Sequence, residues 1–546
     1  MKKLFLLIII IIFTISFSFK CGHNQIKKPP KIVNNSIIKN NNKTRNLETY
    51  HPISFYIDYS TMDKYFINFP NEPYQNFLKS AINSTLEIFS QLLKVKRKGN
   101  LRIPPPYECS GKINYYNREI RDGVDNDIII FPIIDRYLDD GVDAAASGCF
   151  LNKEDYRPIM GYVLLRKDYS YTKLNAKEYF IMLLLHEITH ILVFDNFLYD
   201  YYIYRNITTT KIINGVNRTF ITTPKVKNIA SQHFNCSDII GVELENHGGS
   251  GSAGSHWEGR VMLGDYMIST DYHEIVISDI TLALFEDSGW YEVNYYTGGL
   301  FRFGKNQGCN FLNTTCLTSG KSNFEWEFCD NEIDEICSSN NLNRGYCYIA
   351  KYDKDLDSYY QYFDDKRKGG MKFMDYCPVA ENYYSEEYYF NSNCINGEKD
   401  EIETNYPSSL GFSISENSIC IQSSLIKSSD DNLKEYAFKR AMCHKILCNS
   451  NNQTIKVDIG EYIIECPKEG GEMEIDGYNG TIKCPPYNRV CTNKNFINDP
   501  IKAVLNHITN SDLDYSFKYE IPDVIAYSQF LVLFIYKYFL IFMLLF

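Results

Sequence analysis

The sequence predicts an α+β protein in which strands and helices come first and a loop-rich, disulfide-held part comes last. Up to about residue 190, short apolar runs typical of strands alternate with segments of helical periodicity, in the order of an α/β sandwich. From about residue 300, cysteine, glycine and proline dominate and the periodicity fades. A chain of 546 residues with 44% hydrophobic content can hold more than one such domain.

The first residues have the features of a secretory signal. Lys2 and Lys3 form a charged start, an apolar run follows, and a small-x-small pattern ends at Ser18. An uncleaved anchor helix is the alternative, but the apolar run is short for a membrane span. We therefore expect residues 1–18 to be a signal peptide. The polar, Asn- and Lys-rich segment 19–48 should be a removable or flexible prosegment.

The next part of the chain should contain three strands and a helix. The strands are predicted from short apolar runs. The helix is predicted from one apolar stripe, which is formed by Leu78, Ile82, Leu86, Phe89 and Leu93. We expect strands over 53–58, 126–134 and 159–167 and a helix over 76–95.

A second helix is predicted over 176–192. Asn175 and Glu178 have the spacing of a capping box, which marks the start of a helix. The leucines and isoleucines that follow predict a largely buried helix rather than a solvated one.

This second helix carries the sequence His-Glu-x-x-His. His186 and His190 lie one turn apart on the same face, so each can present an imidazole nitrogen to one metal ion. Glu187 is then placed to reach a water on that ion. A solvated helix face is the alternative, but buried histidines beside a buried carboxylate need a partner.

A catalytic zinc site takes three protein ligands and leaves one position to water, so a third ligand is required. The extended form of the motif adds a glycine and then a histidine or aspartate. Those positions hold Val193 and Asn196 here, with Asp195 one place short. A downstream acidic residue is a second possibility, with Glu243 and Glu245 as candidates.

The segment 230–270 resembles the leishmanolysin family of surface metalloproteases, which includes invadolysin and belongs to the metzincin clan. Its sequence Gly-Ser-His-Trp-Glu is the context in which that family places the third zinc ligand after an insertion. The resemblance therefore assigns this role to His256 in preference to His247. A methionine turn follows in the family, and Met267 matches it. The resemblance covers about residues 50–495.

The resemblance implies a metzincin-type catalytic domain with a mixed sheet and a zinc-binding helix. A middle subdomain and a disulfide-rich, loop-rich C-terminal domain should follow. The segment 278–295 should form a helix that closes the catalytic part. The implied boundaries are 49–195 for the N-terminal catalytic subdomain, 196–300 for the insertion with the third ligand and methionine turn, 301–512 for the Cys-rich domain and 513–546 for a spacer and hydrophobic tail.

By the same resemblance, the chain should be a zinc metalloendopeptidase that acts on protein or peptide substrates. One Zn²⁺ ion would serve catalysis, Glu187 would be the general base, and a role in cell adhesion is a further expectation. A strand at Gly161, Tyr162 and Val163 should be an edge strand that pairs with extended substrate. The alternative is a catalytically inactive surface adhesin or binding protein on the same fold. Val193 departs from the family's glycine, which leaves the helix with a positive φ.

Cys21 resembles the switch cysteine of the leishmanolysin prosegment, with a histidine two positions later. A thiolate is a good zinc ligand and could hold the unprocessed enzyme inactive. The chain has 17 cysteines, and without Cys21 the remainder could form eight disulfides. The alternative is a stray thiol near the signal cleavage site.

The expected location is the secretory pathway and then the cell surface or the extracellular space. A net charge of −11 argues against a nucleic-acid partner. An apolar tail at 524–546 follows small residues at 510–512 and a polar spacer, which resembles a glycolipid-anchor signal. A transmembrane tail is the rival, and either form would attach the protein to a membrane. Sequons such as Asn83 and Asn479 permit glycosylation.

Overall fold

The computed structural model describes most of the chain between residues 49 and 491 and two short stretches before it. The predicted signal peptide at 1–18, the predicted tail at 513–546 and the predicted cap Asn175 lie outside the described residues. No helix of the described part is both long enough and apolar enough to cross a membrane. The described residues are 20–21, 29–33, 49–96, 100–103, 105, 109–113, 117–138, 142–169, 176–213, 215–249, 252–270, 276–295, 301–332, 335–382, 392–395, 397–399, 401–430, 433 and 440–491.

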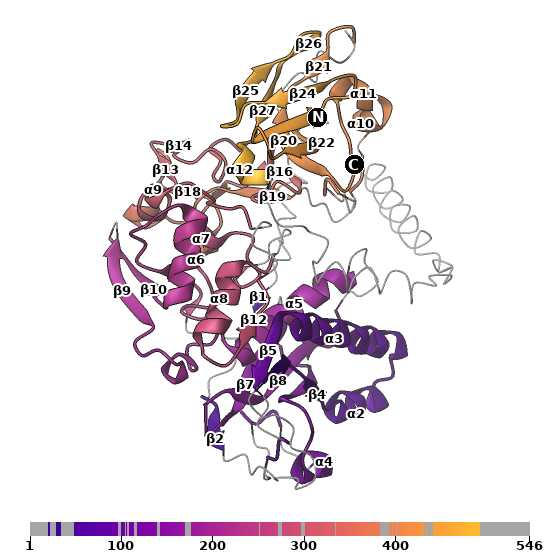
Figure 1. The fold of residues 1–546 in the computed structure, drawn as a ribbon, viewed down its shortest axis with the longest axis vertical. Coiled ribbons are helices and arrows are strands. Elements are labelled where there is room, and N and C mark those ends of the chain that lie inside the picture. The colour runs from indigo at the N-terminus through magenta and orange to yellow at the C-terminus, as the bar shows by residue number, and fades with distance from the viewer. Residues whose placement is uncertain are drawn as a thin grey trace, which may run out of the picture. The chain divides into compact units, whose positions relative to one another are not determined.

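A six-stranded mixed sheet forms the core of the N-terminal half (Figure 1). Its strands are β1 (Lys20–Cys21), β2 (Lys31–Val33), β4 (Phe55–Ile57), β6 (Ile128–Asp135), β7 (Val142–Asn152) and β8 (Pro158–Arg166). They are ordered β1, β7, β8, β6, β4, and β2 also pairs with β7. β4, β6 and β8 run parallel, β7 runs antiparallel to β8, and β1 and β2 run parallel to β7.

The three predicted strands are present as β4, β6 and β8, whereas the sequence gives no sign of β7. This strand has the sequence Val-Asp-Ala-Ala-Ala-Ser-Gly-Cys-Phe-Leu-Asn, and all but one of its residues are buried. Because both of its faces are covered, it lacks the alternation of apolar and polar residues that marks a half-exposed strand.

Helices cover this sheet, and the two long ones are those that the sequence predicts. The helices and further strands of this half are β3 (Tyr50–Pro52), α2 (Ser60–Asn68), α3 (Glu72–Leu92), β5 (Leu93–Lys96), α4 (Arg118–Asp122) and α5 (Ala176–Leu192). α5 has the predicted bounds and packs against α3, β7 and β8. α3 begins four residues before the predicted start, because the Asn71 side chain accepts a hydrogen bond from the backbone NH of Tyr74.

The predicted apolar stripe of α3 is wrong at its last member. Leu93 begins β5, which pairs with β3 and with a later strand, so this side chain is buried as part of a sheet. Leu78, Ile82 and Phe89 are buried along α3 as expected.

The middle of the chain adds a three-stranded sheet and short helices. Its elements are η2 (Tyr199–Tyr201), β9 (Thr208–Ile213), β10 (Val216–Ile221), α6 (Pro224–Phe234), β11 (Val242–Leu244), α7 (Gly259–Met262), α8 (Asp279–Asp287) and β12 (Glu292–Val293). The helix predicted over 278–295 is therefore shorter than expected. It ends before Gly289, which has a φ of 83°, and the chain then forms β12 and pairs with β5.

The C-terminal part holds more regular structure than the loop-rich region that the sequence predicts. Its largest sheet is ordered β24, β23, β22, β20, β27, β25, and buried residues such as Ile421, Ile455 and Ile482 form its core. These strands are β20 (Ser418–Ser423), β22 (Arg440–Asn449), β23 (Thr454–Asp458), β24 (Ile463–Cys466), β25 (Gly471–Glu474) and β27 (Thr481–Cys484).

The remaining elements of this part are short. The helices are α9 (Cys309–Asn313), η4 (Ser358–Tyr360), η5 (Lys372–Met374), α10 (Glu401–Asn405), α11 (Pro407–Leu410) and α12 (Tyr487–Val490). The strands are β13 (Leu317–Thr318), β14 (Lys321–Ser322), β15 (Glu335–Cys337), β16 (Arg344–Cys347), β17 (Ala350–Lys351), β18 (Lys368–Gly369), β19 (Ala380–Asn382), β21 (Ile426–Lys427) and β26 (Tyr478–Asn479).

Eight disulfides hold the chain together, and they use every cysteine except Cys21. This pairing matches the number that the odd cysteine count predicts. The pairs are Cys109–Cys149, Cys236–Cys309, Cys316–Cys377, Cys329–Cys347, Cys337–Cys420, Cys394–Cys443, Cys448–Cys491 and Cys466–Cys484.

Candidate metal centre

Three histidines meet where α5 faces the segment that follows β11. Nε2 of His186 lies 3.1 Å from Nε2 of His190 and 3.2 Å from Nε2 of His256. All three side chains are buried. Two nitrogens bound to one tetrahedral ion at about 2.0–2.1 Å would lie about 3.3 Å apart. The observed spacing therefore fits one metal ion held by the three Nε2 atoms.

A backbone carbonyl fixes the other ring nitrogen of each histidine. The Nδ1 contacts are His186 with the Tyr266 oxygen at 2.6 Å, His190 with the Phe194 oxygen at 2.7 Å and His256 with the Ser252 oxygen at 3.0 Å. A carbonyl can only accept, so each Nδ1 carries the hydrogen and each Nε2 presents its lone pair. Metal-ligating histidines are oriented in this way. The donor set thus fits a metal ion in its chemistry as well as in its spacing.

Glu187 lies beside His186 on α5, and its side chain is fully buried. Two hydrogen bonds join α5 to Tyr266 in the segment opposite. Tyr266 accepts from His186 through its carbonyl, and its hydroxyl lies 2.9 Å from the Thr189 hydroxyl. The carboxylate therefore belongs to a rigid, desolvated surface next to the histidines.

The segment that carries His256 is held on two sides by backbone hydrogen bonds. The NH of Glu245 donates to the carbonyl of His256 at 2.9 Å. The NH of Trp257 donates to the carbonyl of Met267 at 3.0 Å. Met267 is fully buried. The position of the third histidine is thus set by β11 on one side and by the predicted methionine turn on the other.

A buried side-chain network supports the same segment. Trp257 donates from Nε1 to the Thr281 hydroxyl at 2.7 Å, and this hydroxyl donates to Oδ2 of Asp265 at 2.8 Å. Oδ1 of Asp265 accepts from the NH of Met267 at 2.8 Å, and burial raises the pKa of this carboxyl to about 6. Sequence analysis did not select Asp265 or Thr281. No local pattern marks them, because 16 residues separate the two in the chain.

The chain leaves α5 without the left-handed residue that a glycine would supply. Val193 is fully buried and has no positive φ. Two tyrosine hydroxyls bind the carbonyls at this end of the helix: Tyr291 donates to Leu192 at 3.1 Å, and Tyr202 donates to Val193 at 3.0 Å. These bonds satisfy helix-terminal acceptors that a glycine cap would otherwise serve, so the valine causes no backbone strain here.

The other candidates for a third ligand have other partners. Asp195 accepts from the backbone NH two residues further on at 2.9 Å. The NH of Asn196 donates to the Ser255 hydroxyl. Glu243 belongs to a second, separate cluster of carboxylates, and His247 faces that cluster at 3.4 Å.

The expectation of an edge strand at Gly161, Tyr162 and Val163 is wrong. These residues lie in β8, which is paired with β6 on one side and with β7 on the other. Their backbone groups are already used, so no peptide can add to this strand. On the far side of β7 the sheet ends in the two short strands β1 and β2.

Cys21 lies in β1, where its backbone pairs with Ala144 of β7. The position of its side chain lies outside the described part of the chain.

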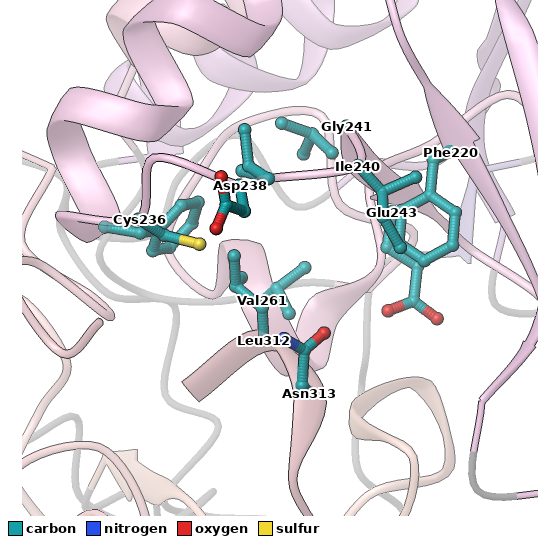
Figure 2. Close-up of a pocket in the computed structure, with 12 residues that line it drawn as sticks. Phe220, Cys236, Asp238, Ile240, Gly241, Glu243, Val261, Leu312 and Asn313 are labelled. Atoms are coloured by element: carbon teal, nitrogen blue, oxygen red, sulfur yellow. The ribbon is translucent and has the colours of Figure 1, made fainter. Parts of the chain in front are cut away.

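A pocket on another part of the surface is lined by residues of β10, β11, α7 and α9, among them Glu243, Val261 and Asn313 (Figure 2). None of the three histidines lines this pocket.

A buried His-Glu-x-x-His helix, packed on a mixed sheet with a distant histidine beside it, is an arrangement typical of α+β proteins of the metallopeptidase class. Comparison with known sequences makes this assignment specific. A sequence model of the leishmanolysin family matches residues 71–498, so the chain belongs to the leishmanolysin family. The family resemblance of the segment 230–270 is thereby confirmed.

Individual relatives cover most of the chain. It is 27% identical over 433 residues to the leishmanolysin homolog of Crithidia fasciculata, covering 75% of this chain and 62% of that protein. It is 25% identical over 450 residues to the leishmanolysin-like peptidase of Drosophila pseudoobscura pseudoobscura, covering 69% and 65%. It is 25% identical over 441 residues to leishmanolysin of Leishmania major, covering 77% and 69%. The chain thus matches less than two thirds of the length of the first two relatives.

Proposed function

We propose that this chain is a zinc-dependent metalloendopeptidase that hydrolyses peptide bonds of extracellular or cell-surface proteins. The observation that carries the proposal is that the Nε2 atoms of His190 and His256 lie within 3.2 Å of Nε2 of His186, the residue before Glu187. Membership of the leishmanolysin family supports it. Zinc is the proposed metal because neutral imidazoles suit it and three of them leave one coordination position open.

The chemistry divides between the metal and the chain. His186, His190 and His256 would hold the ion, and their bonds to backbone carbonyls would keep the rings in place. A bound zinc ion supplies the charge that lowers the pKa of a water and polarises a peptide carbonyl. Glu187 accepts the proton of the attacking water and passes it to the leaving amine, so the carboxylate is regenerated in each cycle.

The substrate is proposed to lie along β7 instead of β8. The outer side of β7 pairs with β1 near Ala144 and with β2 near Leu151, and both of these strands come from the predicted prosegment. Removal of residues 19–48 would leave backbone groups of β7 without those partners. An extended peptide could then add to the sheet at this edge.

Activation and location complete the proposal. Cys21 is proposed to hold the unprocessed enzyme inactive, and the pairing of its backbone with β7 supports a prosegment that lies on the catalytic part. Eight disulfides favour the secretory pathway and an extracellular or surface location. Attachment through the C-terminal tail and a role in cell adhesion belong to the same proposal.

Proteolysis assays of the secreted chain, after removal of the prosegment, test the function. We expect cleavage of a protein substrate that a zinc chelator abolishes and added zinc restores. Glu187→Ala should keep bound zinc and lower the rate by about 10²–10⁴-fold. Glu178→Ala, on the first turn of the same helix, is the matched control and should remain active. A processed wild type that binds zinc but cleaves nothing would instead support the inactive surface-binding alternative.

A further inference from the structure

A second cluster of buried side chains lies apart from the three histidines. Glu243 of β11, Glu258 before α7 and Asp375 after η5 each offer a carboxylate oxygen, and these oxygens lie within 4.8 Å of one another. The three residues are only 3%, 0% and 0% exposed. The cluster joins the segment of the third histidine to a much later part of the chain.

The positive charges around this carboxylate cluster do not balance it. Arg218 lies 2.9 Å from Oε2 of Glu243 and 3.3 Å from Oδ2 of Asp375. Arg260 lies 3.9 Å from Asp375, while its other nitrogens donate to backbone carbonyls. Glu245 is also buried and lies close enough for Asp375 to influence its ionisation. Four carboxylates and two guanidiniums leave a formal charge of two minus, with His247, 3.4 Å from Asp375, counted as neutral.

Two oxygens of the cluster have neither a hydrogen-bond donor nor an ion-pair partner among the described residues. Oε1 of Glu258 accepts from a backbone NH at 3.1 Å, but Oε2 of Glu258 and Oε1 of Glu243 have no donor among the described residues. Glu245 differs, because its two oxygens accept from the NH of His247 and from the Ser269 hydroxyl. A buried carboxylate oxygen without a partner is strongly unfavourable. The unpartnered oxygens of Glu243 and Glu258 therefore call for a positive partner, whereas both oxygens of Glu245 already accept hydrogen bonds.

We propose that Glu243, Glu258 and Asp375 bind a calcium ion, separate from the metal of the three histidines. Carboxylates are the oxygen donors that calcium prefers, and each can bind it through one oxygen or two. Calcium–oxygen distances of about 2.3–2.6 Å allow two ligand oxygens to lie up to about 5 Å apart, which accommodates the spacing of this cluster. A dipositive ion also balances the excess negative charge. Zinc fits less well because its structural sites use nitrogen and sulfur donors.

The calcium ion would fasten the third histidine's segment to the C-terminal part. Glu258 follows His256 by two residues. Beside it, at Gly259, the backbone of this segment already approaches the backbone of Phe373 closely. A Cβ at Gly259 would lie 2.3 Å from the carbonyl oxygen of Phe373, so only glycine fits there. Glu243 also lines the pocket of Figure 2, so one ligand of the cluster borders that pocket. The calcium site does not depend on the proposed peptidase activity.

Calcium titration of the full secreted chain tests this proposal. The chain would carry Glu187→Ala to prevent self-cleavage and would be saturated with zinc. Calorimetry should show one calcium bound per chain, and calcium should raise the Tm. Asp375→Asn removes a charged ligand and should weaken calcium binding by at least about tenfold. Asp365→Asn, at a surface carboxylate paired with Lys351, is the matched control and should bind calcium like its parent.

Terbium luminescence decides the question if Asp375→Asn does not fold. Terbium occupies calcium sites and is excited by nearby tyrosines, and Tyr360 lies close enough to Asp375 for its pKa to be raised by that charge. We expect terbium emission that saturates with added terbium and falls when calcium displaces the bound terbium. The proposal is overturned if the zinc-loaded chain takes up no calcium at about 10 mM, above the range of weak extracellular sites. Emission that calcium does not displace, or an Asp375→Asn variant that binds calcium like its parent, would overturn it equally.

Discussion

Each histidine of the candidate metal centre is oriented by an atom that belongs to the backbone. The carbonyls of Tyr266, Phe194 and Ser252 accept from the three Nδ1 atoms and set the tautomer in which Nε2 presents its lone pair. The orientation of the rings thus depends on the path of the chain after α5 and around the methionine turn. Side-chain changes at these three acceptor positions should therefore be tolerated wherever they preserve that path.

His233 shows how burial sets the charge state of a residue outside the metal centre. Its Nε2 lies 2.8 Å from the Phe303 carbonyl, and burial lowers its pKa to about 4. In the unfolded chain a histidine has a pKa of about 6.5. As the pH falls from about 6.5 to about 4, the unfolded chain takes up a proton that the folded chain does not. This residue therefore lowers the free energy of unfolding on acidification.

Replacement of His233 by Gln should reduce that loss of stability in acid. At about pH 5 the histidine costs about 2 kcal/mol relative to about pH 7, because this pH lies about 1.5 units below the pKa of the unfolded histidine and still above that of the folded one. His444, whose pKa burial also lowers to about 4, should retain its own share of the loss. Urea unfolding at both pH values measures the difference. An equal loss in the variant and the parent would show that His233 is not buried as a neutral group.

At the scale of elements, the close approach of α5 to the sheet positions the metal centre. Gly161 of β8 and Gly148 of β7 are paired across the two strands. A Cβ at Gly161 would lie 2.5 Å from Cγ2 of Ile191, the residue after His190. The absence of a side chain at Gly161 therefore sets the distance between the sheet and α5, the helix that carries two of the histidines.

Gly161→Ala should displace α5 and weaken metal binding. Overpacking of this kind costs about 1–3 kcal/mol of unfolding free energy, and zinc affinity should fall because His190 moves with Ile191. Gly148→Ala is the matched control, since its Cβ would come no closer than 3.7 Å to the helix backbone. Urea unfolding and a zinc titration would measure both effects. The packing argument fails if the two variants are equally stable and bind zinc equally well.

Elements with a strong periodic signal could be predicted from the sequence, and those defined by tertiary contacts could not. α5 has its predicted bounds because its apolar run and its motif agree. β7 could not be predicted because burial on both faces removes the alternation of a strand. Leu93 was assigned to a helix because a helical stripe continues through it, whereas pairing with β3 and β12 draws it into β5.

The same distinction holds for the candidate site. The spacing of His186 and His190 is visible in the sequence because a helix fixes their geometry locally. His256 was selected only through the family resemblance, since no local rule connects it with α5. Glu258 and Asp375 could not be associated with each other, because only the folded chain brings them within reach.

At the scale of the whole molecule, two of the disulfides connect parts that the sheets do not. Cys236 and Cys309 join the end of α6 to the start of α9, across a separation of 73 residues. Cys337 and Cys420 join β15 to β20 across 83 residues. Closing such long loops restricts the unfolded chain, which favours the folded state.

The pairing of sixteen cysteines makes a prediction about the seventeenth. After removal of the signal peptide, the denatured but unreduced chain should contain one free thiol, from Cys21. Removal of residues 19–48 should reduce this number to zero. Thiol titration before and after processing gives the two counts. A thiol that persists in the processed chain would contradict the disulfide pattern described above.

The central claim is that His256, 66 positions after His190, completes the metal centre. The most direct measurement is the zinc content of purified chains that carry single histidine substitutions. We predict about one zinc per chain for the wild type and for His247→Ala, and loss of tightly bound zinc for His256→Ala, because two imidazoles alone hold zinc weakly. Circular dichroism would verify that both variants are folded. A folded His256→Ala chain that retains one zinc, or a His247→Ala chain that loses it, would contradict the account.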